Sequence, residues 1–420
     1  MAHHLVIQLA RFGDVIQTKR LLLSLSAKPG DVIHLAVDIS LAVLARQVYP
    51  FAVVHGIHAH ATNARAVEVL FHNRNAFAAL AEISFTSVYT LNFSGMTLSL
   101  AGLFDPDIVH GYSRDHGQVF RSRWLRMGFR WMANRRMAPL NLVDLWACLH
   151  PDPIDPVLVN PKPKPGGGKK IAIVAAGREA RRSLPPEILA PLVASAFAAC
   201  GGPEVVILGS NAERLFARKL ARLLPPAVLQ KMDDACGRTS LLDLPNILAD
   251  CDLVLTPDTG IMHLAAHMGV PIMAFFLSSA WCFETGPYGE GHTIFQATRT
   301  CAPCVETRPC PCNVACLPPF AAPEIVQCVR GKEPTAWPGD LVLLRSVCDT
   351  LGCDYVPLLG EVSENQNRED LRALLTEYRG KGGVGAIPDW VAKTVFHETD
   401  WILPPPLLAD DFLTRIPEGE

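Results

Sequence analysis

One segment in the second half of the chain combines residue types that suit it to holding a phosphate. It reads Thr-Pro-Asp-Thr-Gly-Ile-Met-His-Leu-Ala-Ala over residues 256–266 and follows the apolar run 253–255. A helix that begins here offers free N–H groups and the positive end of its dipole to an anion. Gly260 allows a close approach of the backbone, and His263 lies one turn further on. The segment predicts an anion-binding helix N-terminus; the alternative is a capped helix with a buried histidine.

A second, basic turn follows the apolar run 171–175. It reads Gly-Arg-Glu-Ala-Arg-Arg over residues 177–182. Three arginines and a glycine between a strand and a helix could neutralise a diphosphate. The alternative is a basic turn that is simply solvated. The diphosphate interpretation is favoured if this turn and the segment 256–266 lie on the same sheet edge.

The first strand-like run of the chain ends in Arg-Phe-Gly-Asp at residues 11–14. The turn has no Gly-x-Gly-x-x-Gly, so the dinucleotide-binding fingerprint is absent. Asp14 would stand at the mouth of a crevice, where a carboxylate can act as general base on an acceptor hydroxyl. Alternatively, Asp14 caps a helix that begins at Val15.

An arginine-rich run occupies residues 114–136. Its arginines are Arg114, Arg121, Arg123, Arg126, Arg130, Arg135 and Arg136, against the single acid Asp115. Aromatic and aliphatic residues alternate with these arginines, so the run could bind an anionic acceptor or an anionic lipid surface. The alternative is a helix that packs its apolar side on the domain and leaves its arginines in water.

Five of the 13 cysteines fall within residues 301–316, with the spacing Cys-x2-Cys-x5-Cys-x-Cys-x3-Cys. In a cytoplasmic protein such a group indicates metal binding more than a disulfide framework. The first pair has the two-residue spacing of tetrahedral thiolate sites, and ligand identity alone does not separate zinc from iron. The alternative is a set of unmetallated thiols that line a loop.

These residues are placed by strands that alternate with helices in two halves of the chain. We expect strands at 5–10, 31–38, 53–54, 87–93, 171–175, 204–208, 253–255 and 271–276. We expect helices at 15–25, 41–47, 186–199, 213–224, 242–249, 262–268 and 368–378. This alternation is typical of parallel sheets with crossover helices, whose ligands bind at the carboxyl ends of the strands.

A stretch with six prolines and three glycines separates the two halves and cannot continue a helix or a central strand. The predicted organisation is therefore an N-terminal Rossmann-like domain, a linker, a C-terminal Rossmann-like domain with the cysteine-rich loop, and a partly helical extension. The boundaries are 1–150, 151–170, 171–330 and 331–420.

The composition excludes several classes of protein. The chain has 420 residues, of which 49% are hydrophobic and 19% charged, so global disorder is excluded. A net charge of -3 disfavours a nucleic-acid binder. No apolar run approaches the roughly 20 residues that span a bilayer, and no targeting segment is expected. We expect a cytoplasmic protein, with peripheral membrane contact as a second possibility.

Three segments together resemble the ADP-heptose:lipopolysaccharide heptosyltransferases of glycosyltransferase family 9. They are Asp-Thr-Gly-Ile-Met-His-Leu-Ala-Ala-His-Met-Gly-Val-Pro at 258–271, Thr-Gly-Pro-Tyr-Gly at 285–289, and the start at 5–18. The cysteine-rich stretch is also of the kind seen in this family. The resemblance covers roughly residues 1–330. It implies an α/β GT-B fold, two Rossmann-like domains facing a cleft, with the acceptor on the first domain and the donor on the second.

The resemblance also implies roles for individual residues in an inverting heptosyl transfer from ADP-heptose that uses no catalytic cofactor. Asp14 matches the family's general base; Asp258, Thr259, Gly260 and His263 match its donor loop; and Gly177, Arg178 and Arg182 match its phosphate turn. Cys301, Cys304, Cys310 and Cys316 lie where the family's cysteines lie and would hold a structural zinc or iron, with Cys312 and Cys328 as alternates.

The chain departs from the family in two places. Ser183-Leu184-Pro185 follows Arg182, where the family often carries a lysine before Trp-Pro, which leaves the donor sugar open. The extension after residue 331 has no match; it would supply a helix that packs back across the cleft, or an interaction surface.

The resulting leading hypothesis is a transferase of lipopolysaccharide core assembly. Peripheral contact with the inner membrane and formation of a homo-oligomer are further expectations. The alternatives are a protein heptosyltransferase of the autotransporter type with a metal-bound cysteine motif, and a non-catalytic nucleotide-sugar-binding protein. A retained Asp14 argues against the last, because a protein that only binds has no need of a base.

Overall fold

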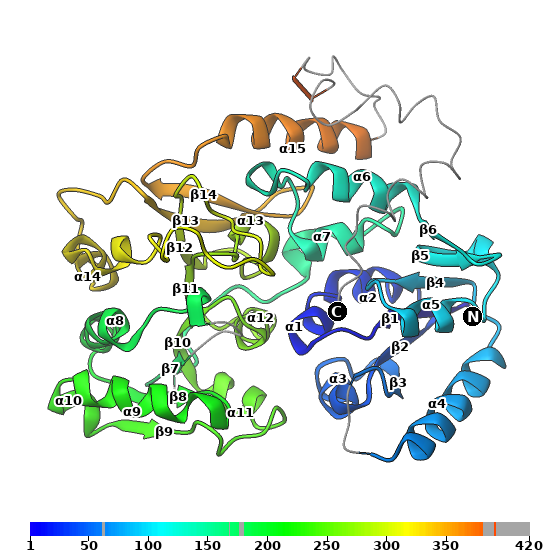
Figure 1. Cartoon of the computed structure of the whole chain (residues 1–420), viewed down its shortest axis with the longest axis horizontal. Coiled ribbons are helices and arrows are strands. Elements are labelled where there is room, and N and C mark those ends of the chain that lie inside the picture. The colour runs from blue at the N-terminus through cyan, green and yellow to red at the C-terminus, as the bar shows by residue number, and fades with distance from the viewer. Residues whose placement is uncertain (61–63, 168, 176–179, 381–389, 392–420) are drawn as a thin grey trace. The chain divides into compact units, whose positions relative to one another are not determined.

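The computed structural model describes residues 1–60, 64–167, 169–175, 180–380 and 390–391 (Figure 1). The chain divides into two compact units. The first unit comprises residues 1–139, 145–154 and 366–420, and the second comprises 140–144 and 155–365. Each unit is built on one sheet of mostly parallel strands, as the alternation of strands and helices predicts.

The sheet of the first unit has six strands in the order β3-β2-β1-β4-β5-β6. The strands are β1 (His3–Gln8), β2 (Val32–Asp38), β3 (Ala52–Ile57), β4 (Ser87–Thr90), β5 (Val109–Asp115) and β6 (Gln118–Arg121). The first five are parallel, and β6 pairs antiparallel with β5 as a hairpin. Leu5, Val6 and Ile7 of β1 are completely buried, because a parallel sheet covered on both faces needs continuous apolar strands rather than alternating ones.

The helices of the first unit are α1 (Phe12–Ile16), α2 (Lys19–Leu25), α3 (Ala42–Val48), α4 (Ala66–Ala81), α5 (Gly95–Ala101), α6 (Arg123–Trp131) and α15 (Asn365–Arg379). The single helix expected at 15–25 is two helices, which separate at Thr18, whose hydroxyl donates to the carbonyl of Val15 at 2.6 Å. Helix α7 (Leu142–Ala147) contains the point at which the chain passes from the second unit into the first.

The expected helix at 368–378 is present as α15 and belongs to the first unit, whereas the strands that precede it in sequence belong to the second. Figure 1 shows it running alongside α6. Arg372 donates to the carbonyl of Pro139 at 2.6 Å, and the Arg379 guanidinium lies 5.6 Å from the ring centre of Trp124. The last part of the extension is thus tied to the first unit by arginines.

The sheet of the second unit has eight strands in the order β14-β13-β12-β11-β10-β7-β8-β9. The strands are β7 (Lys170–Val174), β8 (Glu204–Leu208), β9 (Met232–Asp234), β10 (Cys251–Pro257), β11 (Ile272–Phe276), β12 (Thr293–Ala297), β13 (Leu341–Cys348) and β14 (Cys353–Leu359). Strands β7 to β12 are parallel, and the antiparallel β13 and β14 bring the start of the extension into this sheet. The strand order reverses between β7 and β10, which creates a switch point at their carboxyl ends.

The helices of the second unit are α8 (Pro186–Ala199), α9 (Arg214–Leu223), α10 (Pro226–Leu229), α11 (Leu244–Ala249), α12 (Gly260–His267), α13 (Cys282–Thr285) and α14 (Pro323–Val329). Single-turn 3-10 helices occur in the two units as η1 (Ile39–Leu41), η2 (Pro106–Ile108), η3 (Arg135–Met137), η4 (Pro156–Leu158), η5 (Ala180–Arg182), η6 (Asn211–Glu213) and η7 (Pro318–Ala321). Helix α8 has the expected bounds, because Pro186 at its first position supplies a fixed φ and lacks only an N–H that the helix start does not use.

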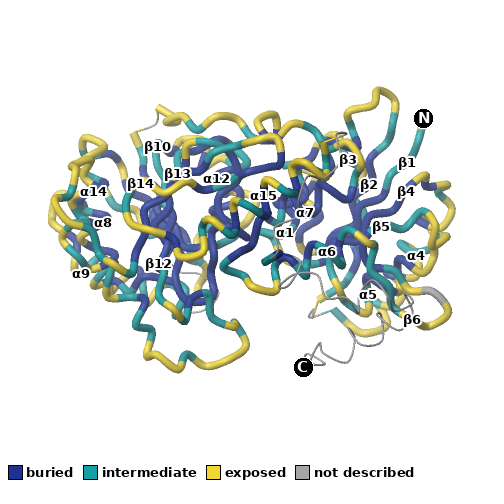
Figure 2. Tube along the Cα trace, turned by 90° about the horizontal axis from the view of Figure 1, so that it is seen from above, coloured by how far each residue is buried: buried dark blue, intermediate teal, exposed yellow. Residues whose placement is uncertain are grey.

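The core of each unit lies at its sheet. Figure 2 shows the strands as the buried part of the trace, with exposed residues concentrated in loops and on outer helix faces. Ile171, Ile173 and Ile207 of the second sheet are completely buried. Within the described ranges, every helix is too short or too polar to cross a bilayer.

Candidate functional site

The candidate site of the second unit lies at the switch point, where β10 ends and α12 begins. Thr259 is the N-cap of α12, and its hydroxyl oxygen accepts from the backbone N–H of Met262 at 3.3 Å. The hydroxyl of Thr256 lies 3.2 Å from that of Thr259. Gly260 is the first helical residue, two positions before the start expected from the sequence. The predicted helix N-terminus is therefore confirmed, and its geometry suits an anion.

Asp258 has three partners, two of them from distant parts of the sequence. Arg182 Nη2 lies 2.5 Å from Asp258 Oδ2, and the hydroxyl of Thr285 donates to the same oxygen at 3.0 Å. His263 Nε2 lies 3.8 Å from the other carboxylate oxygen. The side chains of Asp258 and His263 are each 7% exposed and that of Arg182 is 15% exposed. A carboxylate withdrawn from water to this extent requires a cationic partner, and Arg182 supplies it.

The structure brings together most of the donor residues expected from the sequence. Arg182 is the last residue of η5 and pairs with Asp258 at the edge of the sheet. The basic turn and segment 256–266 therefore lie on the same sheet edge, which favours the diphosphate interpretation. Gly177 and Arg178 lie outside the described residues. Thr285 is a partner that the sequence analysis did not single out; the only signal was its place at the start of the segment 285–289.

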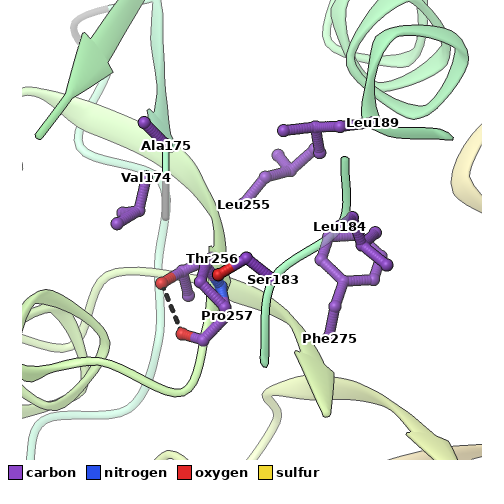
Figure 3. A pocket seen from close by; sticks show the side chains of 9 residues that line it. All are labelled: Val174, Ala175, Ser183, Leu184, Leu189, Leu255, Thr256, Pro257 and Phe275. Carbon is purple, nitrogen blue, oxygen red and sulfur yellow. Dashed lines mark hydrogen bonds between the residues drawn. The ribbon is translucent and has the colours of Figure 1, made fainter. Parts of the chain in front are cut away.

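A small pocket opens beside this cluster at the carboxyl ends of β7, β10 and β11 (Figure 3). Its lining residues are Val174, Ala175, Ser183, Leu184, Leu189, Leu255, Thr256, Pro257 and Phe275. Apolar side chains form most of the wall, while Ser183 and Thr256 contribute hydroxyls. The Thr256 hydroxyl donates to the carbonyl of Pro257 at 2.7 Å. Such a lining suits an uncharged part of a ligand whose charged part lies at Asp258 and α12.

Asp14 lies at the carboxyl end of β1 in the first unit. Helix α1 begins at Phe12, so Asp14 is its third residue rather than its cap. One carboxylate oxygen of Asp14 accepts from the backbone N–H of Arg11 at 3.0 Å, in a capping box. The side chain thus stabilises the start of the helix, as the capping alternative expects, but from the third helical position rather than from the cap. Its role as a base stays a prediction.

Two further residues near α1 were missed by the sequence analysis. Tyr49 is completely buried, and its hydroxyl lies 3.1 Å from the carbonyl oxygen of Val15 and 2.9 Å from that of Ile16, which fixes the end of α1. Lys19 opens α2, and burial lowers the pKa of its ammonium group to about 8. A lysine that titrates near neutral pH is a candidate for proton transfer or anion binding.

The arginine-rich run folds as the β5–β6 hairpin, α6 and η3. Leu125, Gly128 and Trp131 form the buried side of α6, as the packing alternative requires. Arg130 is half-buried, and burial together with the neighbouring Arg126 lowers the pKa of its guanidinium group. Binding of an anionic acceptor or lipid by this run stays a prediction.

The cysteine-rich loop does not form the expected metal site. All four predicted ligands are described, and no group of three or more His, Cys, Asp or Glu side chains in the described ranges is arranged to hold a metal ion. Cys316 is buried in the apolar core, and the Cys310 sulfur accepts from the backbone N–H of Val314 at 3.3 Å. Cys304 Sγ points to the carbonyl of Cys301 at 3.4 Å. The prediction of a structural zinc or iron is therefore not supported by the described residues.

The fold has counterparts among solved structures. A glycosyl transferase family 9 protein from Veillonella parvula matches 71% of this chain and 88% of its own, with a TM-score of 0.53 and 17% identity. E. coli ADP-heptose lps heptosyltransferase II matches 69% of this chain and 88% of its own, with a TM-score of 0.50 and 16% identity. The two sheets of mostly parallel strands and this structural similarity show a GT-B fold. The predicted fold class is therefore confirmed.

The comparison of sequences covers a shorter part of the chain. Residues 193–313 match the model of glycosyltransferase family 9 (heptosyltransferase). Lipopolysaccharide heptosyltransferase 1 of Pseudomonas aeruginosa is 35% identical over 98 residues, and lipooligosaccharide heptosyltransferase 2 of Haemophilus influenzae is 28% identical over 95 residues. Each match covers 23% of this chain and about a quarter of the relative, 26% and 27% respectively.

Proposed function

We propose that the protein is an inverting glycosyltransferase that moves heptose from ADP-heptose to a lipopolysaccharide core acceptor. The observation that carries the proposal is the cluster of Arg182, Asp258 and His263 at the N-terminus of α12. The helix start lies within the segment that matches the family. The name of the similar E. coli enzyme supplies the donor, and the curated relatives supply the class of acceptor.

The donor would bind to the second unit. A nucleoside diphosphate carries negative charge, which the N-terminus of α12 and the guanidinium of Arg182 attract. Asp258, held by Arg182 and Thr285, offers acceptor oxygens to sugar hydroxyls. The apolar pocket beside Thr256 would take an uncharged part of the donor.

The acceptor would bind to the first unit, with Asp14 as general base. As the acceptor oxygen forms its bond to the anomeric carbon, its proton passes to the carboxylate of Asp14. The bond between the anomeric carbon and the diphosphate breaks, and the nucleoside diphosphate leaves with the electron pair. Arg182 and the helix N-terminus stabilise the charge that develops on the leaving group.

The test is a transfer assay with purified protein and ADP-heptose. One arm contains a lipopolysaccharide acceptor truncated before its heptose, and a second contains a Ser/Thr-rich protein. We expect heptosylation of the lipid acceptor with release of ADP, and loss of transfer in Asp14→Asn. Transfer only to the protein would refute the lipopolysaccharide acceptor and favour the alternative of a protein heptosyltransferase of the autotransporter type. ADP-heptose binding without transfer to either acceptor would favour the non-catalytic alternative.

A donor screen separates the donor assignment from the acceptor. Thermal shifts with ADP-, UDP-, GDP- and CMP-sugars should show the largest stabilisation with the ADP-sugar. A larger shift with another nucleotide would refute the ADP-heptose assignment and leave a glycosyltransferase of different donor. A location at the cytoplasmic face of the inner membrane, and self-association, stay predictions.

A further inference from the structure

The cysteine-rich loop, residues 301–316, contacts the turn of the donor site through Arg181, which the proposed mechanism does not use. Arg181 Nη1 donates to the carbonyl of Arg308 at 2.7 Å. Its Nη2 donates to the carbonyls of Val305, at 3.3 Å, and of Glu306. One guanidinium group thus donates to three backbone carbonyls of the loop. Its planar arrangement of five N–H donors makes this possible.

The next residue in the chain is the arginine of the donor site. Arg182 Nη2 pairs with Asp258, while its Nη1 lies 3.6 Å from the carboxylate of Glu306. Both terminal nitrogens of this guanidinium therefore face carboxylates, one from the sheet edge and one from the loop. Because Arg181 holds the backbone of Glu306, the same residue also fixes the carboxylate that lies beside Arg182.

The two ends of the loop have anchors of their own. The loop is anchored at one end by the backbone N–H of Cys304, which donates to the carbonyl of Ser278 at 2.9 Å, and at the other by the buried Cys316. Between these anchors Val305 is 55% exposed, so burial of apolar surface does not hold segment 305–308. The hydrogen bonds from Arg181 join this segment to η5.

We propose that Arg181 is a positioning residue of the donor site. It fixes segment 305–308 against η5, and the fixed segment sets the orientation of Arg182 toward Asp258. The loop then contributes to the binding of a nucleoside diphosphate without a metal and without touching the reacting atoms. The ligand in this inference rests on the proposed function; the attachment of the loop does not.

The first experiment measures the attachment alone, by hydrogen exchange of the full chain without ligand. In Arg181→Ala we expect the amides of Cys304 and Arg308, which donate to the carbonyls of Ser278 and Val305, to exchange about tenfold faster or more, because release of the segment from η5 opens these bonds. Arg181→Lys should lie between, because it keeps the charge but not the fork. Arg308→Ala is the matched control: it removes a positive charge from the same exposed segment and leaves the carbonyl that Arg181 binds. Exchange in Arg181→Ala equal to that of the wild type overturns the proposal.

The second experiment measures the consequence, with ADP as the probe in calorimetry and ADP-heptose in kinetics. Arg181→Ala should weaken ADP binding about fivefold to tenfold and raise the donor KM with a smaller change in kcat, because it disturbs ground-state binding. Arg308→Ala should stay within about twofold of the wild type. Faster exchange with unchanged ADP affinity and KM overturns the positioning role. A wild-type protein that does not bind ADP refutes the proposed donor and the positioning role together, while the exchange result still decides the attachment.

Discussion

Acid should destabilise the first unit through a row of histidines that crosses three neighbouring strands. His34 of β2 lies between His3 of β1 and His55 of β3, with ring nitrogens 2.9 Å apart on each side. His34 is 5% exposed, and the edge of its ring meets Phe85. Burial, with further contributions from His55 and His3, lowers the pKa of His34 to about 4 from its ordinary value of 6.5.

The sign follows from the direction of this shift. The folded pKa is depressed, so the unfolded chain takes up the proton first, and stability falls as the pH drops from 6.5 toward 4. At pH 5 His34 is protonated in most unfolded chains and in few folded ones, which costs about 2 kcal/mol relative to pH 7. The full loss, reached below pH 4, approaches about 3 kcal/mol. The pKa of His55 is also lowered, by burial and by Arg46, and adds in the same direction.

The assay is urea unfolding followed by tryptophan fluorescence and circular dichroism at pH 7 and pH 5. The informative quantity is the difference between wild type and His34→Leu, because other buried groups titrate in both proteins. We expect His34→Leu to lose about 2 kcal/mol less than the wild type between the two pH values. His60→Leu, at an exposed histidine, should behave as the wild type. An equal loss in wild type and His34→Leu would refute the reasoning.

Three predictions concern the proposed transfer. Asp14→Asn should lower turnover by about two orders of magnitude or more and leave donor affinity nearly unchanged, because a base acts only in the chemical step; single-turnover rates and calorimetry measure the two. Asp258→Ala and His263→Ala should weaken donor binding more than acceptor binding, and unchanged donor affinity in both variants by calorimetry would contradict their placement. If α6 contacts a phosphorylated acceptor, the pair Arg126→Glu and Arg130→Glu should raise the acceptor KM steeply, as should added salt; unaltered kinetics would leave α6 a packing helix.

Local signals in the sequence were sufficient for four strands of the second sheet, β7, β8, β10 and β11, and for part of the donor site. Helix α8 and strand β8 have the expected bounds, because a proline at a helix start and a short run of β-branched residues decide structure within a few positions. The Thr-Gly start of α12 is likewise a local feature, since Thr259 caps the helix that Gly260 begins. The family resemblance rested partly on the same segment.

Local signals were not sufficient where the outcome depended on a distant partner. Helix α4 was not foreseen, because its exposed residues include Val67, Leu70 and Phe71, which blur the amphipathic pattern. The extension was expected as one portion, yet it supplies two strands to the second unit and α15 to the first. This division depends on contacts with distant residues. Strand β13 pairs with the edge strand β12 of the second unit, while Arg372 of α15 donates to the carbonyl of Pro139 in the first unit.

In the candidate site, too, the sequence indicates the chemistry of the residues, and the tertiary structure decides which of them are in contact. The residue types of Asp258 and Arg182 predicted their chemistry, but 76 positions separate them, and only the pairing of β7 with β10 brings them to 2.5 Å. The contact of Thr285 with Asp258 likewise exists only in the folded unit. Cysteine spacing suggested a metal site, whereas the fold buries Cys316 in the core, and no group of three or more His, Cys, Asp or Glu side chains in the described ranges is arranged to hold a metal ion. Spacing along a chain limits how far two side chains can be apart, but the directions in which they point are set by the packing around them.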